Sequence, residues 1–227
     1  MQYSTDVETL FLFNTNDLRV TYMNFKTYQE TKLQHTENLK QTIVEAAAML
    51  LQEQGPEAVT IRRVAEKMEC STKIIYNLFN KKDGLIKFLY LEGCKLLSKS
   101  FQSVIRQENM EDYLRALCEA YWDFSYNYAS YYQLMFGGAF SKFKPEEESI
   151  YATTTALQQF TQAITEAIEA GLIAEKDPQE VVGVIWASLH GVIHLYLGGH
   201  IKNLETAKAL YDKSVTKLIR TYMQSST

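Results

Sequence analysis

Residues 59–85 read VTIRRVAEKMECSTKIIYNLFNKKDGL, and this stretch decides the fold of the N-terminal part of the chain. Apolar residues recur at helical spacing on both sides of a break at Glu69-Cys70. Thr60 and Ser71 stand where helix N-caps are favoured. The stretch therefore predicts two short helices joined by a tight turn.

Two such short helices are not stable alone, so a third helix must pack behind them. The preceding segment TENLKQTIVEAAAMLLQEQG, residues 36–55, carries an apolar stripe that ends at Gly55. Thr36 can cap its start. Three helices in this order form the smallest unit that places one helix in the major groove of DNA.

The polar residues of this unit bear on whether it binds DNA. Residues 60–82 hold six basic side chains and two acidic ones, in a chain whose net charge is −4. The second short helix carries hydrogen-bonding side chains that can reach base edges and phosphates. An ordinary surface bundle with capping residues is the alternative that remains open. The exposed polar set is expected to be Ser71, Thr72, Lys73, Tyr76 and Asn77.

The chain from IVEAAAMLLQEQG through NKKDGL resembles the DNA-binding region of the TetR family of bacterial regulators. That family has an Ala-Ala helix ending in Gly, a Thr-x-x-x-Ile/Val-Ala helix and a Gly-Val-Ser turn. A Leu-Tyr-x-x-Phe recognition helix follows, with a Lys three residues after the Phe. The matching positions are Ala46, Ala47, Gly55, Thr60, Val64, Ala65, Ser71, Tyr76, Phe79, Lys82 and Leu85.

This resemblance implies roles at the DNA for individual residues. Thr60 would cap its helix against a phosphate, Tyr76 would place its hydroxyl on the DNA backbone, and Lys82 would add charge at the start of the next helix. Arg62 can serve a base or a phosphate, and a helix-packing role stays open for Tyr76. The expected base readers are Thr72, Lys73 and Asn77, which with Ser71 complete the predicted DNA-binding set.

Glu69 and Cys70 depart from the family pattern, which has Gly and Val at these places. If Glu69 must adopt a left-handed backbone conformation, its side chain costs on the order of 1 kcal/mol relative to glycine. The departure weakens the turn without threatening the fold.

The remaining sequence also predicts helices throughout, including one long amphipathic helix over residues 146–171. We therefore expect an all-α protein of about nine helices. Its parts are an arm of low order over 1–35, a helix-turn-helix DNA-binding domain over 36–85, and an effector-binding and dimerisation domain over 86–227. Met23 precedes a polar, helix-compatible lead-in, so the native chain can start there.

Aromatic side chains crowd residues 113–136, in larger number than one side of a helix can bury. One interpretation is an aromatic core with tyrosines at its edge. The other is an apolar pocket with a few polar groups, the usual form of a small-molecule site. The pocket interpretation predicts a small-molecule effector. Its expected lining is Tyr121, Phe124, Gln158, Thr161, Trp186 and His190.

The segment WASLHGVIHLYLGGH, residues 186–200, resembles the Trp…His-Gly signature of one C-terminal subclass of the family. The helix over 179–198 is apolar on nearly every side and must be covered all round, which indicates a subunit contact. Two such helices with their C-terminal companions would form a four-helix bundle in a homodimer, and a dimer can recognise a palindromic operator. The expected interface residues are Val181, Ile185, Leu189, Val192, Tyr211, Val215 and Leu218.

His190 and His194 stand four residues apart, a spacing that zinc hydrolases also use, so a metal-dependent hydrolase is an alternative function. However, the intervening GVI lacks an acidic general base, and no third ligand is evident nearby. A dimeric helical scaffold that does not bind DNA is a further alternative. We expect no enzyme and no cofactor, but a transcriptional regulator. It would be a repressor that leaves its operator when the effector binds.

The cysteines and the apolar runs indicate where in the cell the protein is located. Three cysteines without a Cys-x-x-Cys pair indicate neither a disulfide framework nor a cysteine zinc site. No apolar run of about 18 residues and no secretory leader is evident. We therefore expect a cytoplasmic protein that contacts no membrane, with operator DNA, a second copy of the chain and the effector as its partners.

Overall fold

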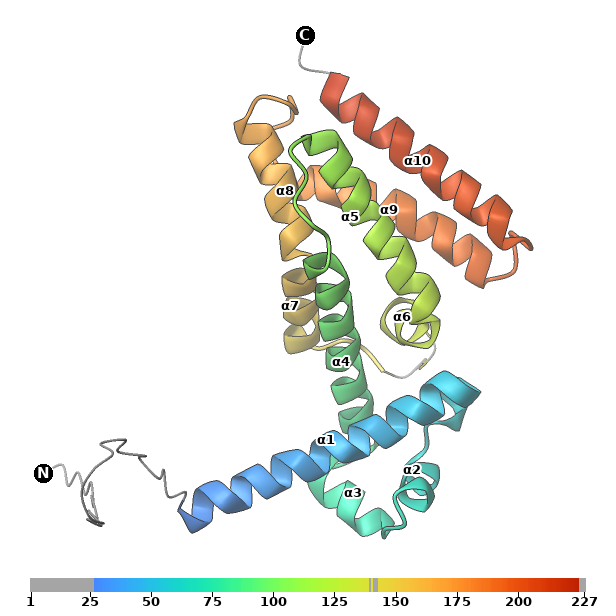
Figure 1. Cartoon of the computed structure of the whole chain (residues 1–227). Coiled ribbons are helices and arrows are strands. Elements are labelled where there is room, and N and C mark those ends of the chain that lie inside the picture. The colour runs from blue at the N-terminus through green and yellow to red at the C-terminus, as the bar shows by residue number, and fades with distance from the viewer. Residues whose placement is uncertain (1–26, 139, 141–142, 225–227) are drawn as a thin grey trace, which may run out of the picture. The chain divides into compact units, whose positions relative to one another are not determined.

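The computed structural model describes residues 27–138, 140 and 143–224, and within these ranges it contains ten α-helices, one short 3₁₀ helix and no strand (Figure 1). The all-α prediction is confirmed, and the expected number of about nine helices is close. The described residues up to Asn38 and those from Leu39 onward form separate compact units.

Helix α1 (Tyr28–Gln54) begins well before Thr36, the expected cap. The Glu30 amide donates to Thr27 Oγ1 at 3.2 Å, and the Thr27 amide donates to Glu30 Oε2 at 2.6 Å, which is a capping box. Thr36 lies inside the helix, where its hydroxyl donates to the Lys32 carbonyl at 2.9 Å. The expected arm of low order is therefore wrong for residues 28–35. Residues 1–26, with Met23, lie outside the described residues.

The predicted three-helix unit is present. The 3₁₀ turn η1 (Pro56–Ala58) leads to α2 (Ile61–Lys67), α3 (Thr72–Phe79) and α4 (Lys82–Gln102). Thr60 caps α2 as expected, since its hydroxyl accepts from the Arg63 amide at 3.2 Å. The interior of the unit consists of fully buried apolar side chains, among them Ile43, Ala47, Leu51, Val64, Ile75 and Leu85.

Helix α4 continues from this unit into the C-terminal half, where it contacts α5, α6, α7 and α8 (Figure 1). The predicted domain boundary at residue 85 falls inside its first turn. Asn109 caps α5 through the Asp112 amide, and Asp177 caps α9 through the Gln179 amide. The C-terminal half comprises α5 (Met110–Asn127), α6 (Ala129–Phe136), α7 (Glu147–Ala156), α8 (Gln158–Glu169), α9 (Pro178–Leu197) and α10 (Leu204–Gln224).

The single helix expected over 146–171 is two helices, α7 and α8, which meet at Leu157. Three consecutive threonines before the break donate their hydroxyls to carbonyls four residues earlier: Thr153, Thr154 and Thr155. Such bonds bend helices, and three in succession favour a break at this point.

The expectation that the chain has no apolar run of about 18 residues is wrong for α9. By length and composition it could cross a membrane. The same property is expected of a helix packed among others, and α9 contacts both α8 and α10.

Candidate DNA-binding and effector sites

Helix α3 has one buried face and one exposed face. Ile75 and Phe79 are buried against the rest of the unit. Tyr76 is 50% exposed, so its hydroxyl is available to a partner from outside the chain. The structure thus brings the predicted polar set to one exposed helix, with Ser71, Thr72, Lys73, Tyr76 and Asn77 all exposed.

The turn before α3 has the geometry of a Schellman motif. Glu69 has a positive φ of 50° and so adopts the left-handed conformation whose cost was considered above. The Cys70 amide donates to the Ala65 carbonyl at 3.0 Å, and the Glu69 amide donates to the Glu66 carbonyl at 3.2 Å. These bonds end α2 and aim α3 away from it.

The basic residues of the unit differ in their surroundings. Arg62 is exposed, and its Nε donates to Glu66 Oε1 at 2.9 Å, a surface pair that DNA could displace at little cost. Lys73 is exposed and has no ion pair within the described part of the chain. Lys82 is half-buried at the first residue of α4, and its ammonium lies 5.1 Å from the centre of the Phe140 ring.

Gly84 is a structural residue of this unit that the sequence prediction does not include. A Cβ added to Gly84 would lie 2.0 Å from the Phe79 carbonyl oxygen. The first turn of α4 therefore approaches the end of α3 at a distance that only glycine allows. A glycine in the first turn of a predicted helix is the available signal, because glycine is a poor helix former.

In the C-terminal half, three helices bring a polar cluster together. Trp186 of α9 donates its indole N–H to the Tyr121 hydroxyl of α5 at 2.9 Å. The hydroxyls of Tyr121 and of Tyr132 on α6 lie 3.2 and 2.5 Å from His190 Nδ1. We refer to Tyr121, Tyr132, Trp186 and His190 as the Tyr-His cluster.

The Tyr-His cluster is neutral at physiological pH. Burial, aided by the neighbouring His194, lowers the pKa of His190 to about 4. Burial also raises the pKa of both Tyr121 and Tyr132, which keeps their hydroxyls protonated. A tyrosine hydroxyl therefore donates to Nδ1 of His190, and this bond places the imidazole proton on Nε2.

The predicted effector lining is only partly assembled. Tyr121, Trp186 and His190 belong to the cluster, and Phe124 is buried with its ring centre 6.5 Å from that of Tyr132. Gln158 is exposed. Thr161 donates its hydroxyl to a carbonyl of its own helix. These last two do not join the cluster, whereas Tyr132 does and is absent from the predicted set.

Two hollows lie beside the cluster. An apolar cavity next to Tyr121 and Trp186 encloses about 20 Å³, room for about one water molecule. A larger hollow of about 160 Å³ lies between the C-terminal ends of α6 and α9, lined by Tyr132 and His194 among others. The Nε2 atom of His194 is buried and has no hydrogen-bond partner.

The histidines do not assemble a metal site within the described residues, where no group of three or more His, Cys, Asp or Glu side chains could hold an ion. The rings of His190 and His194 lie 4.3 Å apart, and His200 is exposed beyond the end of α9. The two histidines therefore have no third ligand among the described residues, and Nδ1 of His190 is already bonded to a tyrosine hydroxyl.

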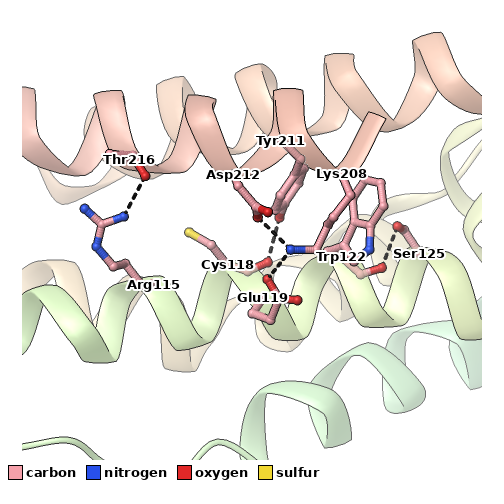
Figure 2. A network of polar contacts seen from close by, with 9 residues as sticks. All are labelled: Arg115, Cys118, Glu119, Trp122, Ser125, Lys208, Tyr211, Asp212 and Thr216. Atoms are coloured by element: carbon pink, nitrogen blue, oxygen red, sulfur yellow. Dashed lines mark hydrogen bonds and ion pairs between the residues drawn. The ribbon is translucent and has the colours of Figure 1, made fainter. Parts of the chain in front are cut away.

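The expected interface residues lie on the inner faces of α9 and α10. Leu218 is half-buried, and the other six are buried in the chain's own interior. The Tyr211 hydroxyl, for example, donates to the Cys118 carbonyl of α5 at 2.6 Å (Figure 2). Beside it, Lys208 of α10 bonds Glu119 of α5 at 3.0 Å, which fixes α10 on α5 (Figure 2).

The outer face of α9 is mostly apolar and includes two glycines and an alanine. Val184 and Leu195 are 43% and 45% exposed, and Ala187 lies between them on the same side. A Cβ added to Gly183 or Gly191 would meet no atom within 4 Å. A second helix could approach this face closely.

A three-helix unit with an exposed polar helix, continued by α4 into a helical bundle with a buried polar cluster, defines a helix-turn-helix protein with a C-terminal regulatory bundle. Residues 43–88 match the family model described as bacterial regulatory proteins, tetR family. Residues 114–221 match the model of the tetracyclin repressor-like C-terminal domain. The chain belongs to the TetR family and is a DNA-binding transcriptional regulator. Members of this family are generally not enzymes.

Solved structures share the fold at low sequence identity. A protein of unknown function from Rhodococcus sp. RHA1 is 21% identical, covers 82% of this chain and 94% of its own, and superposes with a TM-score of 0.67. The fatty acid degradation regulator FadR from Bacillus halodurans is 17% identical, covers 79% and 94%, and gives 0.61. The regulator PfmR from Thermus thermophilus is 20% identical, covers 77% and 97%, and gives 0.57. No curated protein matches the chain.

Proposed function

We propose that the protein is a cytoplasmic homodimeric repressor that binds a palindromic operator through α3 and leaves it when a small molecule binds the C-terminal half. The exposed face of α3 carries this proposal. Thr72, Lys73 and Asn77 offer hydrogen-bonding groups to base edges. Tyr76 and Arg62, which are also exposed, offer donors to the DNA backbone.

The start of α4 adds a second point of contact with DNA. Lys81 is the N-cap of α4, and no side chain caps this end of the helix. The amides of the first turn can therefore donate to a phosphate, and Lys82 at the first helical position supplies charge. Thr60, the N-cap of α2, would offer a further contact to a phosphate at the start of that helix.

Helix α4 also supplies the route by which an effector would act on α3. Gly93 of α4 is buried against α6, and a Cβ placed there would lie 2.7 Å from Met135 Sδ and 3.3 Å from Tyr131 Cδ1. A ligand that moves α6 would therefore move α4 and the helix joined to it. Release requires that the effector bind the form with low DNA affinity more tightly, since equal affinity shifts nothing.

The outer face of α9 is the surface that a second copy would cover. Val184→Glu places a charge in that interface, whereas Ile150→Glu alters an apolar residue of α7 that is 59% exposed elsewhere. We expect the Val184 variant to sediment as a monomer and the Ile150 variant to remain a dimer. If both variants remain dimers, α9 does not form the interface.

DNA binding can be tested without a known operator. Selection from random DNA would first provide a binding site, and fluorescence anisotropy would then measure affinity. Tyr76→Ala with Lys82→Ala removes two phosphate contacts, and we expect affinity to fall by about two orders of magnitude and the salt slope by about one. Tyr151→Ala with Lys95→Ala, exposed residues of the same types on α7 and α4, is the matched control. Equal affinity of the two double variants would contradict the assignment.

The alternative of a helical scaffold gives a different result. Such a protein would enrich no sequence in the selection, and any residual binding would be weak and independent of sequence.

A further inference from the structure

We propose that a hollow between the C-terminal ends of α5 and α9 is an effector subsite, and that it takes a neutral ketone or ester of about one ring in size. The carbonyl oxygen of the ligand would accept a hydrogen bond from the indole N–H of Trp122. This inference rests on the proposed function, because it assigns a position and a chemical class to the effector that the C-terminal half is proposed to bind.

The size of the hollow limits the ligand. Its volume is about 150 Å³, and it lies next to the first residue of α6. An apolar cavity of about 150 Å³ in another protein holds a benzene molecule. Ile193 and Leu197 of α9 supply apolar wall, and Ala129 of α6 leaves space where most side chains would stand. A ligand with a single six-membered ring and a short substituent therefore fits this space.

The indole N–H of Trp122 is the polar group that gives the hollow its chemistry. Trp122 is only 6% exposed, and this N–H donates to no atom of the described chain. The nitrogen is not sealed from solvent, since the sealed side-chain atoms without a partner among the described residues are three others: Ser149 Oγ, Glu175 Oε2 and His194 Nε2. Figure 2 shows the nitrogen on the side of the ring that faces Ser125, which also lines the hollow. The N–H is therefore a donor that a ligand in the hollow can reach.

The lining of the hollow favours a ligand without charge. No charged side chain is among the described residues that line it. A charged group would lose its hydration there without gaining a counter-charge. An anion is disfavoured further, because a larger open hollow that shares Trp122 and Tyr126 carries only one lysine against four carboxylates: Glu119, Asp123, Glu205 and Asp212.

A carbonyl suits the indole N–H better than an alcohol does. An indole N–H can only donate, so the ligand must supply an acceptor. A ketone or ester oxygen accepts without bringing a donor of its own, whereas an alcohol brings an O–H group that needs a further partner. The hydroxyls of Tyr126 and Tyr196, which also line the hollow, can add a second donor to the same oxygen.

The hollow would stay open in the proposed dimer. Leu195 belongs to the outer face of α9, which the second copy is proposed to cover. Ile193 and Leu197 lie two residues before and after it, and two residues correspond to about 200° around a helix. The wall that α9 gives to the hollow therefore faces away from the proposed interface.

The position of the hollow links its ligand to regulation. Ala129 is both part of its lining and the first residue of α6. Further along α6, Met135 lies against Gly93 of α4. A ligand that presses on the start of α6 would thus act on the helix that leads to α3.

NMR of the full chain with acetophenone as the probe tests the inference directly. The chain has two tryptophans, so its spectrum contains two indole N–H signals, which Trp186→Phe would assign. The Trp122 signal should shift as acetophenone is added, because this N–H gains a carbonyl acceptor. The Trp186 signal should stay in place, because that N–H already donates to the Tyr121 hydroxyl at 2.9 Å.

Isothermal titration separates the hydrogen bond from the fit of the ring. Ethylbenzene has nearly the shape of acetophenone and no acceptor. Trp122→Phe removes the donor, so the affinity for acetophenone relative to that for ethylbenzene should fall about threefold to tenfold in this variant, as expected for one neutral hydrogen bond. Benzoate and benzylamine, of similar size and opposite charge, should each bind the wild type at least tenfold more weakly than acetophenone does.

A second variant tests the position of the site without touching Trp122. Ala129→Leu fills the hollow and should abolish acetophenone binding, whereas Ala170→Leu, at an exposed position after α8, should not change it. Acetophenone should also weaken operator binding by the wild type and leave that of the Ala129 variant unchanged.

Several results would overturn the inference. They are no acetophenone binding, a fixed Trp122 signal, binding that survives Ala129→Leu, an unchanged affinity ratio in Trp122→Phe, equal or tighter binding of benzoate or benzylamine, and no effect on operator affinity. Operator binding by the same preparation would then leave DNA recognition by the proposed repressor standing. Failure of the DNA selection would remove the proposed function separately.

Discussion

Glu69 is the residue whose replacement should stabilise the protein, because it holds a left-handed conformation at a turn where a side chain is a disadvantage. Its φ of 50° ends α2 in a Schellman motif, a position where glycine is preferred. The left-handed conformation costs a residue with a Cβ roughly 1–2 kcal/mol. Against this gain, glycine stabilises the unfolded chain by about 0.4–1 kcal/mol, because it has greater conformational freedom there. Glu69→Gly should therefore raise the free energy of unfolding by about 0.5–1 kcal/mol.

Urea denaturation at fixed protein concentration would measure this change, since the stability of the proposed dimer would depend on concentration. For a chain of this size, about 1 kcal/mol corresponds to a rise of roughly 2–4 °C in Tm. Glu69→Ala is the control, because it removes the same charge and keeps the Cβ, and it should change stability by less than about 0.5 kcal/mol. If the alanine variant gains as much as the glycine variant, or glycine gains nothing, the backbone explanation is wrong.

Three further substitutions test other contacts. Gly84→Ala should destabilise the protein by about 3 kcal/mol in urea denaturation and impair DNA binding, because the new Cβ meets the Phe79 carbonyl. Tyr132→Phe should lower the free energy of unfolding by about 1 kcal/mol in urea denaturation, because one donor to His190 is lost while a second hydroxyl remains at 3.2 Å. The pKa of His190 is lowered to about 4 in the folded chain, so the unfolded chain binds its proton first. Wild-type stability should fall as pH drops from about 6.5 towards 4, by at most about 1.4 kcal/mol per unit from this group, and His190→Gln should show a shallower fall.

The helix-turn-helix unit could be predicted from the sequence because its signals are local. Thr60 is a cap followed by an amphipathic turn, and Glu69 stands at a place where the chain must turn sharply. The signal for the start of α1 is equally local, but the apolar stripe from which the helix is predicted begins only at Leu39. The capping box formed by Thr27 and Glu30 lies before that stripe, and its four-residue pattern is the better signal.

The C-terminal half could be predicted only in outline, because its decisive features are contacts between distant segments. A helix that is apolar on nearly every side does not reveal which side faces inward, so periodicity could not separate Val181 from Val184. The Tyr-His cluster forms only where three helices meet. The spacing of residues within one helix therefore could not predict that Tyr132 belongs to it. For the same reason Gln158 is a reasonable polar candidate on its own helix and still points to solvent.

Two glycines of α4 show how the two halves of the protein are mechanically joined. Gly84 brings the start of α4 against the backbone at the end of α3, and Gly93 brings its middle against Met135 of α6. Between them the helix is unbroken, and its 21 residues span roughly 30 Å. A helix in contact at both places transmits a displacement instead of absorbing it, because packed interiors resist compression. Replacing Gly93 with a residue larger than alanine should therefore displace α4, as we propose that a ligand on α6 does. Such a variant should bind the operator more weakly than the wild type when no effector is present.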